Sequence, residues 1–176
     1  MTNNMQTRIS TTGLVLAFAL AASSAPATAA GDDQAKVPAM ALDGTWEVMV
    51  RLINCQTGAQ IGSMFPSLLA FAGNGTLVET TTNPAFAVGQ RESGLGVWSR
   101  TGPAEYQAKS MAFIAFTTNP SATSPGFEAG TQTITQTIEF TAGPDQWTAN
   151  ATIQFADTSG AVYRQGCANA FGQRFQ

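Results

Sequence analysis

Side chains able to do chemistry are scarce in this sequence, and the most versatile of them is missing. The 176 residues include no His, two Cys, eight Lys or Arg and eleven Asp or Glu. Without imidazole, the chain lacks a common metal ligand, the base of Ser-His and Cys-His pairs, and the usual general base near neutral pH. No phosphate-binding loop, dinucleotide fingerprint, zinc-protease motif, CxxC or G-x-S-x-G element occurs. We therefore expect no metal and no cofactor.

The carboxylates remain as possible acids or bases, because burial can raise the pKa of a Glu. Glu79, Glu105, Glu128 and Glu139 lie in or beside predicted strands. Glu79 and Arg100 fall on neighbouring strands and could pair. We expect all four carboxylates to be solvated surface charges.

The overall charge restricts the partners. The formal net charge is −3, the pI is about 4.7, and only 11% of the residues are charged. Nucleic-acid binding needs clustered Lys and Arg, so no nucleic-acid partner is expected. The hydrophobic fraction of 44% is typical of a folded globular chain.

The N-terminal segment has the pattern of an export signal. Arg8 is the only charge before an apolar run at 13–22, and small residues then lead to an Ala-x-Ala site ending at Ala29. The run is shorter than the roughly 20 apolar residues that span a membrane. We expect a signal peptide at 1–29, cleavage near Ala29, and a secreted or periplasmic location. A retained N-terminal anchor is the alternative.

Export would place Cys55 and Cys167 in an oxidising compartment, where a disulfide is the default. A reactive thiol would need a basic neighbour, and only Arg51 and Arg164 are close in sequence. We predict a structural disulfide, with free thiols as the alternative.

After a polar, flexible arm at 30–42, the region 43–176 is expected to form a single all-β domain. Short runs of alternating polarity are separated by Gly, Pro, Asn and Asp, and Asn74-Gly75 is a strong hairpin signal. Eight strands are expected, at 45–55, 64–72, 76–82, 94–101, 105–118, 127–141, 146–156 and 161–175.

Eight antiparallel strands in up-and-down order can close into a barrel, which removes both exposed sheet edges. Closure makes the first and last strands neighbours. Cys55 ends the first strand and Cys167 lies in the last, so a disulfide across the seam agrees with closure.

Gly44-Thr45-Trp46 opens the first strand directly after the arm, and this resembles the G-x-W motif of lipocalins and other calycin-type barrels. The resemblance implies that Trp46 plugs one end of the barrel and that an Arg of the last strand, Arg174 or Arg164, packs on its ring. The second lipocalin motif (T-D-Y) and a long helix after the last strand are missing. Several segments (CQTG, GNGTLVET, GVWSR, VYRQGC) also resemble small exported bacterial proteins of unassigned function.

A lipocalin-like barrel would hold its ligand in the lumen. The candidate lining residues are apolar: Trp46, Val48, Val50, Leu69, Phe71, Trp98, Phe113, Phe116, Ile134, Ile138, Trp147 and Phe155. They could frame a pocket for a small hydrophobic molecule or simply fill the barrel.

The leading hypothesis is an exported barrel that binds or carries a small hydrophobic molecule. One alternative is a cofactor-free cyclase or isomerase resembling allene oxide cyclases, whose cavity folds the substrate and excludes water. Another is an eight-stranded outer-membrane barrel. Binding is favoured over catalysis, a purely structural or inhibitory role stays open, and the sequence leaves the oligomeric state open.

Overall fold

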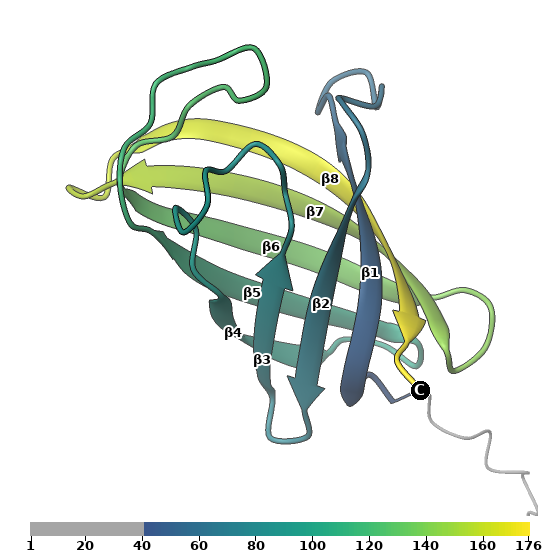
Figure 1. The fold of residues 1–176 in the computed structure, drawn as a ribbon. Helices are drawn as coiled ribbons and strands as arrows, with labels where there is room; N and C mark the ends of the chain where they lie inside the picture. Colours follow the sequence, from purple (N-terminus) through teal and green to yellow (C-terminus); the bar gives the residue numbers. More distant parts are fainter. Residues whose placement is uncertain (1–40) are drawn as a thin grey trace, which may run out of the picture. The chain divides into compact units, whose positions relative to one another are not determined.

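The computed structural model describes residues 41–176, so the predicted signal peptide and most of the predicted arm lie outside the described residues. The described part is built from strands (Figure 1), and among its residues no helix is long and apolar enough to cross a membrane. The strands are β1 (Gly44–Ile53), β2 (Phe65–Ala72), β3 (Thr76–Thr81), β4 (Gly94–Arg100), β5 (Glu105–Ile114), β6 (Gly130–Phe140), β7 (Gln146–Asp157) and β8 (Val162–Arg174).

These strands form a closed antiparallel barrel in which each strand pairs with the next in the chain and β8 returns to β1. The closing register runs from Trp46 opposite Arg174 to Ile53 opposite Cys167. A register shift between Phe155 and Ala156 marks an irregularity in the β7–β8 ladder. The predicted eight-stranded up-and-down barrel is confirmed.

Alternating polarity decides which side chains enter the barrel, because successive residues of a strand point to opposite faces. In β2, Phe65, Ser67, Leu69 and Phe71 are buried, whereas the residues between them are exposed. β5 alternates in the same way along its whole length. Every strand therefore contributes one face to a common interior.

One end of the barrel, here the Trp46 end, is closed by aromatic packing. Trp46 is 0% exposed, and its indole N–H donates to the carbonyl oxygen of Leu42 at 2.9 Å. The Arg174 guanidinium lies 4.3 Å from the Trp46 ring centroid, pairs with Asp145 at 2.9 Å and donates to two backbone carbonyls just before β1. Of the two arginines that the lipocalin resemblance offered, Arg174 therefore packs on the tryptophan.

The opposite end, here the loop end, is covered by the longer connections (Figure 1). Phe86 of the β3–β4 loop packs against Phe127 and Phe155, with ring centroids 4.4 and 6.4 Å away. Arg164 lies over Phe127, 5.0 Å from its centroid. The fully buried Gln90 ties the β3–β4 loop to the β5–β6 loop through its side-chain amide.

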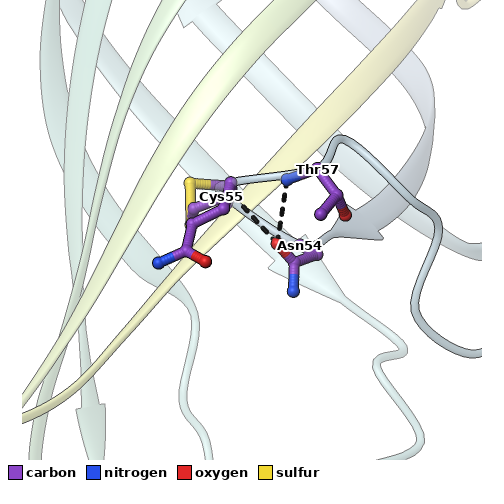
Figure 2. Close-up of a disulfide and its surroundings, with 5 residues drawn as sticks. Asn54, Cys55 and Thr57 are labelled. Atoms are coloured by element: carbon purple, nitrogen blue, oxygen red, sulfur yellow. Dashed lines mark hydrogen bonds between the residues drawn. A yellow bond between two sulfur atoms is a disulfide. The ribbon is translucent and has the colours of Figure 1, made fainter.

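A disulfide joins the first and last strands of the barrel (Figure 2). Cys55 follows β1 and Cys167 lies in β8; their Cα atoms are 5.2 Å apart across a sequence separation of 112 residues. The Asn54 side-chain oxygen accepts hydrogen bonds from the N–H groups of Gln56 and Thr57, which holds the turn that carries Cys55. Residues distant in sequence are thus linked covalently at the closing seam.

Removing this bond should lower stability, because a cross-link across so long a loop restricts the unfolded chain. In the chain-entropy model the loss is about 4–5 kcal/mol. We expect the double variant Cys55→Ala/Cys167→Ala to show a lower urea midpoint than the oxidised protein. Dithiothreitol should lower the wild-type midpoint and leave that of the variant unchanged. Equal midpoints for oxidised and reduced wild type would contradict this expectation.

Candidate functional site

The predicted lining residues separate into three groups in the structure. Five of them pack together at the closed Trp46 end of the barrel: Trp46, Phe71, Trp98, Ile138 and Trp147. Phe155 belongs to the aromatic group at the loop end. Between these two groups, four of the predicted residues line an internal cavity: Val48, Val50, Leu69 and Ile134.

Two predicted lining residues lie outside the barrel instead. Phe113 is 57% exposed because it alternates with the buried Ala112 and Ile114. Phe116 is 42% exposed and lies beyond the end of β5, where the chain has left the sheet. The prediction that they face the lumen is wrong. The inward-facing residues of β5 are the even-numbered ones, which leaves Phe113 outside, and β5 ends at Ile114, before Phe116.

The internal cavity has a volume of about 60 Å³ and lies midway along the barrel, between the two aromatic groups. A water molecule needs about 10–15 Å³ of such space, so about four waters or one very small organic molecule would fit. The wall is mixed: β1, β7 and β8 supply aliphatic side chains, β3 and the β3–β4 loop supply polar ones, and β2 and β6 supply both apolar and polar ones. This cavity is the candidate site.

The polar side of the cavity is organised by a buried ion pair. Arg91, from the β3–β4 loop, donates through Nη2 to Glu79 of β3 and through Nε to Gln132 of β6. Ser110 of β5 donates to the second oxygen of Glu79 at 2.9 Å. The side chains of Arg91 and Glu79 are only 4% and 5% exposed. We call these four residues the Glu79 cluster.

The expectation that Glu79 is a surface charge paired with Arg100 is wrong. Leu77 and Glu79 share the inward parity of β3, and both are buried. Arg100 instead donates to the backbone carbonyls of Gly102 and Pro103 in the β4–β5 turn. The alternation of β3 around Leu77 already indicated that Glu79 points inward. Strand alternation could not indicate Arg91, because this residue reaches the lumen from a loop.

A glycine in β4 makes the Glu79 cluster possible. Gly94 pairs with Glu79 across the β3–β4 ladder, and a Cβ at Gly94 would lie only 2.6 Å from Glu79 Cγ. Without a side chain at this position, Glu79 can pass over β4 and reach Ser110 on β5. The glycine in β4 therefore leaves the space that the Glu79 side chain of β3 occupies.

Two glutamines of β6 complete the polar wall, and sequence reasoning missed both. Gln132 and Gln136 are 4% and 6% exposed and line the cavity. Gln132 accepts from Arg91, whereas within residues 41–176 no hydrogen bond engages the side-chain amide of Gln136. Both share the inward parity of Ile138, which was the available signal.

The cavity wall offers hydrogen-bonding groups and an ion pair, Glu79 with Arg91, whose charges neutralise each other. Both Glu79 oxygens already accept hydrogen bonds. Among the described residues there is no group of three Asp, Glu, Cys or His that could hold a metal ion.

Away from the lumen, the pKa of Asp157 is held below its ordinary range because the carboxylate accepts from the Ser159 hydroxyl and from backbone N–H groups of the β7–β8 turn.

The outer surface has a separate hollow of about 480 Å³ over β1, β2 and β8, bordered by Met49, Leu68 and Phe171. It shares Ser67 with the lumen cavity, but neither Gln136 nor any residue of the Glu79 cluster lines it.

Comparison of the chain with protein-family models and with curated proteins found no match. The functional argument therefore rests on the lumen itself.

Breaking the Glu79–Arg91 pair should destabilise the fold more than removing both charges. Arg91→Met leaves a buried carboxylate without its partner, for which we expect a loss of about 3–5 kcal/mol. The double variant Glu79→Met/Arg91→Met should recover most of this loss, because no uncompensated charge remains. Urea unfolding measures both, with the exposed Lys109→Met as a control within about 0.5 kcal/mol of wild type. Additive losses would show that the two charges are not coupled.

Proposed function

We propose that this protein is an exported binding barrel that holds a small, mainly apolar molecule in its lumen. The observation that carries the proposal is the cavity midway along the barrel, whose wall combines apolar side chains with a few buried polar groups. Ligand sites in proteins are commonly concave and apolar with a few well-placed polar groups. The disulfide fits an oxidising, exported environment.

The size of the cavity limits the ligand. Its volume of about 60 Å³ is well below the roughly 300–1,000 Å³ of pockets for drug-sized molecules. A ligand of about five non-hydrogen atoms suits the space as it stands. A larger ligand would require the β3–β4 loop to move away from the loop end of the barrel, where the Phe86 ring packs on Phe127 and Phe155.

A cofactor-free cyclase or isomerase is the second candidate, because ionisable and amide groups do lie inside the lumen. Glu79 is the residue that such chemistry would use. Its two oxygens are already engaged by Arg91 and Ser110, which favours a structural role and makes binding the better-supported function.

The outer face of β6 and β7 does not fit the outer-membrane alternative, whereas β2 to β5 expose apolar side chains such as Leu68, Val78 and Val97. Exposed positions along β6 and β7 carry polar side chains rather than a lipid-facing apolar band: Thr135, Thr137, Asn150, Thr152 and Gln154.

Binding of n-pentane, followed by methyl NMR, tests the proposal. The methyl signals of Ile134 and Ile153, which line the cavity, should shift on titration, whereas those of the exposed Ile61 should not. Ala168→Leu adds a side chain to the cavity wall and should weaken the response at least about tenfold. Ala70→Leu, on the outer face of β2, is the matched control and should bind as wild type does.

Absence of any shift at Ile134 and Ile153 in the folded wild type would overturn lumen binding. Shifts confined to Met49 and Leu68 would place the molecule in the outer hollow instead.

A further inference from the structure

We propose that the lumen ligand carries one uncharged hydrogen-bonding group, such as a hydroxyl, carbonyl or amide, which the side-chain amides of Gln136 and Gln132 recognise. The inference rests on the proposed lumen binding and adds the chemical class of the ligand. Its starting point is the pair of buried glutamines that β6 contributes to the cavity wall.

Gln136 supplies the main argument. The residue is only 6% exposed and lines the cavity, and within the described residues its side-chain amide has no hydrogen-bonding partner. The residues paired with it across the ladders are Ala108 and Ala151, whose side chains carry no polar atom. Burying a primary amide without partners is unfavourable, so buried amides normally have one. The partner of this amide is therefore a water or a ligand group in the cavity, and a ligand that displaces the water must replace its hydrogen bond.

Gln132 adds a donor of known orientation. Its carbonyl oxygen accepts from Nε of Arg91, so its NH₂ group is the atom left to donate. No acceptor for that NH₂ group occurs among residues 41–176. A hydroxyl or carbonyl oxygen in the cavity could accept from Gln132 or Gln136, and a hydroxyl or amide could also donate to the oxygen of Gln136.

The charge balance of the wall excludes an ionised group. Of the residues that line the cavity, only Glu79 and Arg91 are charged, and they neutralise each other. The Arg91 Nε and Nη2 atoms and both Glu79 oxygens are already engaged within the Glu79 cluster. An anion or a cation entering the lumen would lose its hydration without gaining a counter-ion, which is unfavourable in a buried site. The remaining wall is mainly apolar, with Ser67, Thr81 and Asn83 as its other polar residues, so we expect the rest of the ligand to be mainly apolar.

A matched series of four probes of similar size tests the inference: 1-butanol, n-pentane, butyrate and butylammonium. Binding is followed by the methyl signals of Ile134 and Ile153 and by the side-chain amide signals of Gln132 and Gln136. We expect 1-butanol to bind about 3- to 10-fold more tightly than n-pentane, the gain typical of one hydrogen bond. Butyrate and butylammonium should bind more weakly than either.

Gln136→Met keeps a similar side-chain length and removes the amide, so it should abolish the preference for 1-butanol while leaving n-pentane binding intact. Gln154→Met, on the outer face of β7, is the matched control and should keep the preference. Because the replaced amide lacks partners, Gln136→Met should fold at least as stably as wild type. The order of the four probes on the wild type is a test that does not depend on this variant.

The outcomes separate the two proposals. If n-pentane binds in the lumen as tightly as 1-butanol, the head-group inference is overturned while lumen binding stands. If Gln136→Met leaves the preference unchanged, recognition by the Gln136 amide is overturned. Preferred binding of butyrate or butylammonium overturns the neutral class. If none of the four probes shifts the cavity signals, lumen binding fails, and the inference fails with it because water alone occupies the cavity.

Discussion

The pairing of β8 with β1 is the constraint on which the rest of the structure depends. Once the sheet is closed, the inward face of every strand must share one narrow interior, and no strand edge is left unpaired. The disulfide between Cys55 and Cys167 and the stack of Arg174 on Trp46 both secure this seam, one near each end of β1. A shift of one residue in the β1–β8 register would turn the inward side chains of one strand out to solvent.

Closure also explains the layering of the interior. Aromatic rings fill the Trp46 end and the loop end, where large flat side chains can close the openings of the cylinder. Between them the barrel holds the Glu79 cluster and Gln136, which need partners that an apolar core cannot supply. Gly94 leaves room for the Glu79 side chain, and the loop that brings Arg91 is held by the buried Gln90. The polar layer is thus assembled from β3, β5, β6 and a loop, each of which supplies one part.

Strand parity predicted most of the fold but little of the site. Alternation located all eight strands, and the Gly44-Thr45-Trp46 motif identified the closed end. The same parity, applied to Leu77 and Glu79 or to Gln136 and Ile138, would have placed the polar residues inside. Residue type predicts the opposite for these residues, because charged and amide side chains are usually exposed. For Phe113 and Phe116, hydrophobicity predicts the interior, whereas the alternation of β5 and its end at Ile114 place them outside.

The sequence by itself determined the all-β class, the number of strands, their order and the pair of cysteines at the seam, because these depend on local alternation, turn residues and chain order. Only the tertiary structure decided that Arg91 pairs with Glu79, that Gly94 makes room for this pair, and that the cavity is about 60 Å³ with an amide on its wall that has no partner among residues 41–176. The physical reason is that these features arise where side chains from several strands and a loop meet in the lumen. Their partners depend on register, strand twist and packing across the whole barrel, which no single segment of the chain encodes.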